Sequence, residues 1–313
     1  MLKEFKSAEF LRMLEVDMFS NLPQRRGTRV DLYSVILVGC LALLLASCSS
    51  TETDAVAPDP SAKVQLDYEK SLISFPLDAY RISPQERARI LLAREVIMTN
   101  CMKQFGFIDD PNLAYPQFEN RNYGVWNVER VKRLGFHLVN ENSGTSGAEQ
   151  ESGPWGDARY ACLDQEKSKL DQITPSDELF NGGVAFRLAQ RSLTLASQTD
   201  TWKQGSEDWR ACITAAGLTP MPGFATWSSQ QGFDLQHGRA PGNQVDSGMA
   251  EEISIATVEA QCNQEVHLTQ RLGDIQASFQ VPLIKANQAA LTEVRQQSIK
   301  YVDAAEKLLT ENR

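Results

Sequence analysis

An apolar run close to the start of the 313-residue chain decides where the remaining residues fold. Residues 32–45 are almost wholly apolar, follow three arginines between positions 25 and 29, and lead through small residues to a cysteine. A basic segment, a short apolar run and small residues form the pattern of a secretory signal peptide. A transmembrane helix needs about 20 apolar residues, more than this run provides. We therefore predict that residues 1–47 are a signal peptide, for which Met18 is the better-placed start.

The end of the signal carries a more specific pattern. Leu45-Ala46-Ser47-Cys48 resembles the bacterial lipobox. The resemblance implies that Cys48 receives a diacylglycerol thioether, becomes the mature N-terminus and anchors the chain to the outer face of the cell membrane. The alternative is an ordinary signal peptidase site near Ala46, which would leave Cys48 as a spare thiol.

The residues after Cys48 are too polar at first to form a core. Residues 49–63 are mainly Ser, Thr, Asp, Ala and Pro. Such a composition cannot bury enough apolar surface to fold. We expect residues 48–66 to be a flexible tether and residues 67–313 to form one α-helical extracytoplasmic domain.

The charge of the exported part limits its partners. Residues 1–47 hold six of the 31 basic and five of the 40 acidic residues, so the rest of the chain has a formal charge of −10. No compact Lys/Arg cluster follows Cys48. This charge argues against a nucleic-acid partner. It also disfavours an electrostatic grip on anionic lipid, so the lipid anchor is the expected link to the membrane.

Four cysteines remain in the exported domain, Cys101, Cys162, Cys212 and Cys262. An even number outside the cytoplasm indicates two disulfides, and four cysteines allow three connectivities. The alternative is a zinc site. Spacings of 61, 50 and 50 residues contain no Cys-x-x-Cys pair, and structural zinc sites use such close pairs. We therefore expect no metal and no cofactor.

The apolar spacing predicts a mainly α fold. Ser83 to Glu86 has the residues of a helix start, a serine cap, a proline at the first position and a glutamate at the third. Ile90, Ala93, Ile97, Cys101 and Phe105 then recur at steps of three and four, which places them on one buried face. We predict further helices at 128–134, 155–172, 183–197, 201–216 and 251–280, a break or kink at Pro282, and a long C-terminal helix over 283–310.

Two segments of the chain look alike. In 98–107 and in 209–218, a cysteine stands at a helix end shortly before a glycine. Each of these cysteines is followed, 61 or 50 residues later, by another helical cysteine. We interpret this as a duplicated helix-loop-helix unit, about 83–172 and 200–280, each stapled by its own disulfide. This favours the pairing 101–162 with 212–262, and the other two connectivities stay open.

A family resemblance rests on the order of several short motifs rather than on any one of them. The motifs are Phe75-Pro76-Leu77-Asp78-Ala79-Tyr80, Cys101-Met102 with Gly106-Phe107, Tyr123-Gly124-Val125, Leu134-Gly135-Phe136-His137, Trp209 with Cys212 and Gly217, and Ile255-Ala256 before Cys262. Over residues 70–300 the chain resembles uncharacterised actinobacterial secreted lipoproteins. The resemblance implies a compartment and a fold, and it carries over no catalytic residue.

Catalytic patterns are weak in this sequence. The chain has only three histidines, His137, His237 and His267, and none belongs to a known catalytic motif. The pairs Asp109-Asp110 and Glu251-Glu252 are the candidates for carboxylate chemistry. Adjacent carboxylates do not face each other across a substrate as glycoside hydrolysis requires, so a solvated turn and a charged helix start are the favoured interpretations.

Aromatic loops are the better candidates for ligand contact. Tyr123, Trp126 and Trp227 lie in two loops rich in aromatic residues, and aromatic faces bind sugars and peptides. The alternative, which we favour, is that they pack in the core. The leading hypothesis is a non-enzymatic binding or interaction module for a cell-envelope component or a membrane protein. The second hypothesis is a cell-wall hydrolase, which needs a cleft that joins two carboxylates beside exposed aromatics.

Overall fold

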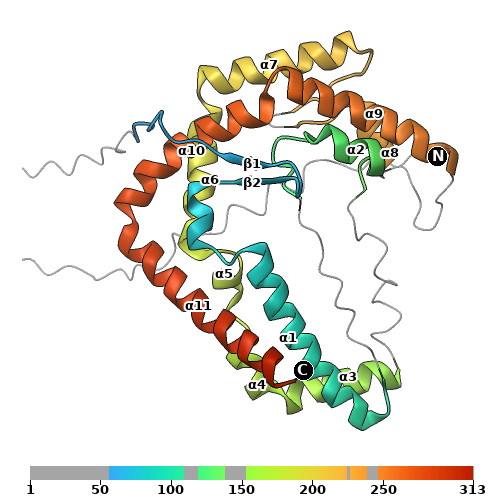
Figure 1. Ribbon diagram of the computed structural model, residues 1–313, viewed down its shortest axis with the longest axis vertical. Helices are drawn as coiled ribbons and strands as arrows, with labels where there is room; N and C mark the ends of the chain where they lie inside the picture. Colours follow the sequence, from blue (N-terminus) through green and yellow to red (C-terminus); the bar gives the residue numbers. More distant parts are fainter. Residues whose placement is uncertain (1–55, 109–118, 138–152, 224–225, 238–245, 313) are drawn as a thin grey trace, which may run out of the picture. The chain divides into compact units, whose positions relative to one another are not determined.

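The computed structural model of the chain describes residues 56–108, 119–137, 153–223, 226–237 and 246–312 (Figure 1). The fold of this part is mainly α, as the sequence predicted. Its helices are α1 (Pro84–Met102), α2 (Val128–Leu134), α3 (Pro154–Gln165), α4 (Lys167–Ile173), α5 (Asp177–Phe180), α6 (Gly183–Ser197), α7 (Asp200–Ala215), α8 (Gln230–His237), α9 (Asp246–Glu265), α10 (Leu268–Ala286) and α11 (Gln288–Glu311). Two short strands, β1 (Gln65–Asp67) and β2 (Leu72–Ser74), pair antiparallel with Leu66 opposite Ile73. None of the helices in these residues is long and apolar enough to span a membrane.

The predicted start of α1 is confirmed. Ser83 Oγ accepts the Glu86 amide at 3.2 Å, and the Glu86 carboxylate accepts the Ser83 amide at 2.7 Å. This reciprocal pair satisfies two amides that a helix start leaves without partners. The same carboxylate receives two hydrogen bonds from Arg295 of α11, at 2.7 and 3.0 Å. The Glu86 carboxylate therefore also joins α1 to α11.

The predicted end of α1 needs one correction. Phe105 was expected on the buried face, but 46% of it is exposed. The helix tightens into a 3-10 turn over Lys103–Phe105. A 3-10 helix has three residues per turn instead of 3.6, so the side chain of Phe105 is rotated away from the buried face of α1. Phe107, two residues later, packs instead against the hydrophobic cluster that contains Cys101 and Cys162.

The break predicted at Pro282 lies elsewhere. The chain breaks at His267, which has a left-handed φ of 53° between α9 and α10. Pro282 stands inside α10, and the C-terminal helix starts at Gln288 instead of residue 283. A proline lacks the amide that would bind the carbonyl four residues earlier. Here the amide of Asp59 donates to that carbonyl, Ser278 O, at 2.8 Å. An external donor thus replaces the missing helical bond.

The predicted tether over 48–66 extends too far into the domain. Within it, residues 56–66 pack on α10. The Val64 amide donates to Asp274 Oδ1 at 3.0 Å, Val64 is 5% exposed, and Lys63 pairs with Asp274 at 3.2 Å. The composition of this stretch is polar, but its backbone amides find acceptors on α10 and its few apolar residues join the core. The folded part therefore already includes Val56, and residues 48–55 lie outside the described residues.

The predicted disulfide pairing is confirmed. Cys101–Cys162 joins α1 to α3, and Cys212–Cys262 joins α7 to α9. Each bridge belongs to its own hydrophobic cluster. The two disulfides therefore cross-link two different parts of the core.

The two helix ends that carry the repeat have the same geometry. Gly106 and Gly217 are left-handed, with φ values of 84° and 82°. The amide one residue beyond each glycine donates to the carbonyl just after the cysteine, Phe107 to Met102 at 3.1 Å and Leu218 to Ile213 at 3.0 Å. These are Schellman motifs, in which glycine adopts a conformation that costs other residues energy.

The two stapled units are nevertheless interleaved. The short helix α2 belongs to the first unit by sequence, but it packs on α9 of the second unit. Val131 and Phe136 share a buried cluster there with Ala256 and Ala260. The helices outside both units, α6 and α11, pack on α10 of the second unit and on α1 and α4 of the first unit, respectively. The repeat therefore resides in the stapled helix ends rather than in two separable units.

Loss of either disulfide should destabilise the fold. The bridges close loops of 61 and 50 residues, and chain entropy predicts a stabilisation of about 4 kcal/mol for loops of this length. We expect the double variants Cys101→Ala/Cys162→Ala and Cys212→Ala/Cys262→Ala each to lose about that much free energy of unfolding in urea titrations. A loss below about 1 kcal/mol in both variants would contradict a stapling role.

Restoring the amide at position 282 should release the N-terminal segment. In Pro282→Ala, the new amide competes with Asp59 for the Ser278 carbonyl. We expect faster hydrogen exchange at residues 59–64 in this variant. As a control, Pro84→Ala changes a proline at a helix start, where no carbonyl awaits its amide. Unchanged protection of residues 59–64 in Pro282→Ala would argue against this docking.

Candidate functional site

The three aromatic residues considered as ligand contacts lie in the core. Tyr123, Trp126 and Trp227 are 1%, 4% and 7% exposed and belong to one hydrophobic cluster. A ring buried to this extent presents no face to a sugar or peptide. The ligand-contact interpretation is therefore wrong for these side chains in this structure, and the core-packing alternative holds.

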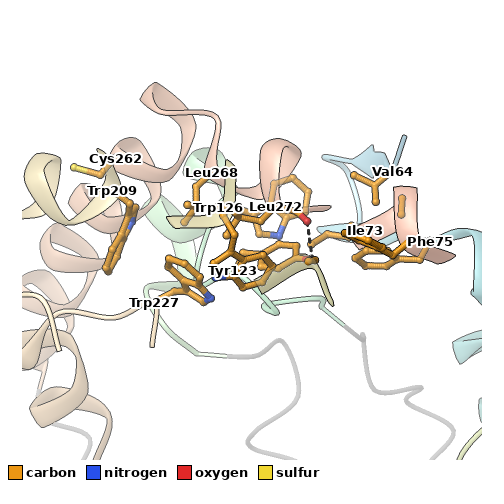
Figure 2. Packing of buried hydrophobic residues seen from close by; sticks show 14 of the residues in the cluster. Val64, Ile73, Phe75, Tyr123, Trp126, Trp209, Trp227, Cys262, Leu268 and Leu272 are labelled. Carbon is orange, nitrogen blue, oxygen red and sulfur yellow. Dashed lines mark hydrogen bonds between the residues drawn. The ribbon is translucent and has the colours of Figure 1, made fainter. Parts of the chain in front are cut away.

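The aromatic residues of the two loops pack together with residues of the helices in one buried cluster. Figure 2 shows Tyr123, Trp209 and Trp227 gathered beside Leu268 and Leu272 of α10. The rings of Trp209 and Trp227 meet edge to face, with centroids 5.9 Å apart. Edge-to-face pairs stabilise a core beyond the area they bury. Irregular segments thus supply the large side chains that fill the space between helices.

A close backbone approach fixes these two aromatic loops against each other. Gly124 has a φ of 78°, and a Cβ built there would lie 2.6 Å from the carbonyl oxygen of Trp227. Any other residue would collide with that backbone. The Tyr123 hydroxyl donates to Gln276 Oε1 of α10 at 2.6 Å, and burial raises the pKa of this phenol. The loop is thus held at the hydroxyl of Tyr123 and at the backbone of Gly124, the next residue.

One face of α9 carries three buried polar side chains, of which sequence analysis considered only Glu252, as a solvated charge. Glu252, Glu259 and Asn263 are 2%, 1% and 2% exposed. Their spacing of seven and four residues places them on the same side of the helix. Such a polar row among apolar neighbours is what a binding or catalytic site would need, so the partners of each side chain decide its role.

Glu252 holds the end of α2. Its Oε1 accepts the Phe136 amide at 2.8 Å, and its Oε2 lies 3.3 Å from His137 Nε2. Gly135, with a φ of 55°, makes room for the carboxylate, because a Cβ there would lie 2.7 Å from Oε1. The neighbouring Glu251 is exposed. The two carboxylates therefore do not form a pair, and the interpretation of Glu252 as a solvated helix-start charge is also wrong.

Glu259 holds the start of α8. Its Oε1 accepts the amide of Ser229 at 2.7 Å and its hydroxyl at 2.6 Å, and the same hydroxyl accepts the Gly232 amide at 2.9 Å. Burial raises the pKa of Glu259 to about 7, although the hydrogen bonds from Ser229 act in the opposite direction. A carboxyl of this pKa is a possible general acid. However, Glu259 is buried, and its Oε1 accepts the backbone amide of Ser229 in the segment that precedes α8.

Asn263 completes the row by gripping the aromatic loop. Its Nδ2 donates to the Tyr123 carbonyl at 2.7 Å, and its Oδ1 accepts the amide and hydroxyl of Thr269 at 3.1 and 2.9 Å. Each member of the row thus satisfies a backbone group of a non-helical segment. The row is a structural device, and its hydrogen-bonding capacity is largely used within the fold.

Cavities near the former candidates are small. A cavity of about 40 Å³ lies between Trp126, Tyr68 and His267. Ligand sites usually measure about 300 to 1,000 Å³, so this cavity suits water rather than a sugar. A shallow groove of about 520 Å³ runs along α3 and α4 and is lined only by polar residues, Asp164, Gln165, Lys167, Ser168, Asp171 and Gln172.

Among the residues that the structure describes, the remaining chemical candidates lie apart from one another. His237 stacks on Phe233 with ring centroids 4.0 Å apart, and its Nδ1 lies 2.9 Å from the Phe233 carbonyl oxygen. His267 forms the α9–α10 junction. Asp109 and Asp110 lie outside the described residues. Within the residues that the structure describes, no group of His, Cys, Asp and Glu is arranged to hold a metal ion.

The buried Glu259 predicts a pH-dependent stability. Its pKa rises from 4.5 in the unfolded chain to about 7 in the fold, so the fold favours the protonated form. The contribution of Glu259 to the free energy of unfolding is complete below about pH 4.5. It is lost as the pH rises through 7, which lowers the free energy of unfolding by about 3 kcal/mol. We expect Glu259→Gln to flatten the decline in the free energy of unfolding between pH 4.5 and 8.

A neighbouring carboxylate provides the matched control for this measurement. Glu251→Gln removes an exposed charge eight residues earlier on α9. It should leave the slope of the wild-type profile unchanged. Equal slopes for wild type and Glu259→Gln would show that the carboxyl titrates alike in both states.

Comparison of the chain with protein-family models, with curated proteins and with solved structures found no match. The resemblance to secreted actinobacterial lipoproteins stays a prediction, since none of these comparisons tests it.

Proposed function

We propose that this chain is a lipid-anchored extracytoplasmic protein whose α-helical domain is a non-enzymatic binding or interaction module at the cell envelope. The anchor is a diacylglycerol thioether on Cys48. The partner is a cell-envelope component or a membrane protein. Nucleic acid is not the expected partner, because the exported part carries a formal charge of −10.

The pair of disulfides is the observation that supports a location outside the cytoplasm. Both bridges join helices, and three of the four cysteines are at most 3% exposed. Disulfides of this structural kind persist in oxidising compartments outside the cytoplasm. A signal that ends at Cys48 would deliver the domain to such a compartment, so the two features support each other.

The state of the buried polar groups supports a binding role over a hydrolytic one. Hydrolysis of a glycan would require two carboxyls that face a common cleft. Glu252 and Glu259 are seven residues apart on α9, about 10.5 Å along the helix axis. Each is enclosed, and each accepts a backbone amide. Among the described residues, their chemistry is therefore directed to the scaffold.

The anchor can be tested directly by metabolic labelling. In Cys48→Ala the thiol that would form the thioether is absent. We expect this variant to lose all fatty-acid label and to be either released from the membrane or mis-processed, with the apolar run 32–45 retained. The matched control is Cys40→Ala, which changes a cysteine inside the predicted signal and should keep both the label and the membrane location.

Persistence of the label in Cys48→Ala would refute the lipoprotein proposal. Partner capture addresses the second half of the proposal. The anchored protein should retain an envelope component after mild detergent extraction and crosslinking, whereas the Cys48→Ala protein, which is released or mis-processed, should retain less of it.

A further inference from the structure

The two disulfides differ in their access to solvent. Cys101 and Cys162 are 1% and 0% exposed, and both lie inside one hydrophobic cluster. Cys262 is also buried, in the cluster that includes Trp209 (Figure 2). Cys212 is the exception, because it is only partly buried at the edge of that cluster. Of the four bridged sulfurs, that of Cys212 is therefore the one that an incoming thiol can reach.

The surroundings of Cys212 place its sulfur at the protein surface. Glu265 Oε2 lies 3.6 Å from Cys212 Sγ, and the Glu265 side chain is exposed. A disulfide sulfur has no proton to donate, so this approach is a surface contact rather than a hydrogen bond. The carboxylate thus marks the open side of the bridge, and its negative charge repels a thiolate that approaches from there.

Loop entropy does not separate the two bridges. They close loops of 61 and 50 residues, and the entropy of loop closure depends only on the logarithm of this length. A bridge whose sulfurs are both buried reacts when part of the protein opens, whereas Cys212 can react in the folded state. Access therefore decides which bridge exchanges first.

We propose that Cys212 is a site of reversible thiol–disulfide exchange, so that the bridge between α7 and α9 is redox-active and the bridge between α1 and α3 is structural. The reactant is a thiol, and a dithiol completes the reduction. The inference is independent of the proposed lipid anchor, because it depends on the two bridges and their burial alone.

The exchange proceeds in two balanced steps. An incoming thiolate attacks Cys212 Sγ and forms a mixed disulfide, while the bond to Cys262 Sγ breaks and that sulfur leaves with the electron pair and takes up a proton. The second thiol of a dithiol then attacks the mixed disulfide, which oxidises the dithiol to a disulfide and releases Cys212 as a thiol. Two electrons have passed from the dithiol to the bridge.

Other contacts keep α7 in place when this bridge opens. One turn before Cys212, Asp208 pairs with Arg271 of α10 at 2.7 Å. Further back, Gly205 packs so closely on α10 that a Cβ there would lie 3.3 Å from Leu272 Cδ2. None of these contacts involves α9. Reduction therefore frees the last turn of α7 from α9 and leaves the rest of the helix on α10.

The position of the mixed disulfide tests the proposal. The folded, full-length protein is treated with glutathione, a monothiol, then quenched with acid and mapped as peptides by mass. We expect a glutathione adduct on the Cys212 peptide, a free thiol at Cys262 and an intact 101–162 bridge. With dithiothreitol, the 212–262 bridge should open at least about tenfold faster than the 101–162 bridge.

Three results would overturn the proposal: an adduct on Cys262 in place of Cys212, equal rates for the two bridges, or no exchange at Cys212 in the folded protein. Unfolding provides the control for burial. In urea that unfolds the domain, both bridges should be reduced at similar rates, because all four sulfurs are then exposed. A rate difference that persists in urea would assign it to the local sequence and refute the explanation by access.

A charge variant tests the path of attack. Glu265→Gln removes the carboxylate beside Cys212 and should speed attack by a thiolate a few-fold at low ionic strength, a gain that added salt should reduce. The matched control is Glu251→Gln, an exposed charge 14 residues earlier on α9 and about 21 Å away along its axis, which should leave the rate unchanged. Equal rates for wild type and Glu265→Gln would contradict attack from this side.

Discussion

The backbone groups of buried non-helical segments are the constraint on which this fold depends. Long irregular stretches run between the helices and place large aromatic residues in the core. A buried amide or carbonyl without a partner costs about as much as a lost hydrogen bond, so these segments need acceptors and donors inside the protein. The two central helices supply them. On α9 these are Glu252, Glu259 and Asn263, and on α10 Gln280 accepts the Leu77 amide at 3.0 Å.

The same constraint explains the place of the N-terminal segment. Pro282 deprives the Ser278 carbonyl of its helical donor, and Asp59 supplies a replacement. A feature that would weaken an isolated helix here becomes a binding point for another part of the chain.

Features of the fold that depend on neighbouring residues could be predicted from the sequence. The cap at Ser83 and the left-handed Gly106 and Gly217 are local, and each has a recognisable residue pattern. The disulfide pairing followed from the repeated position of cysteine before those glycines and from the compartment. For the cap and the two glycines, one short stretch contains most of the interactions that decide its structure.

The features that sequence analysis missed join residues far apart in the chain. Glu252 meets an amide 116 residues earlier, and Asp59 meets a carbonyl more than 200 residues later. Tyr123, Trp126 and Trp227 look like surface aromatics in polar loops, and only the packing of the loops on α10 shows that they are buried. The one available signal was the spacing of Glu252, Glu259 and Asn263, which places polar residues among apolar neighbours on one side of α9.

The central claim is that an acylated, doubly stapled domain resides outside the cytoplasm. The most direct measurement is the mass of the N-terminal and cysteine peptides of protein extracted from native membranes without reduction. The account predicts an N-terminal Cys48 that carries a diacylglycerol group, with linked peptides 101–162 and 212–262. An unacylated chain with another N-terminus, or four free thiols in the domain, would contradict it.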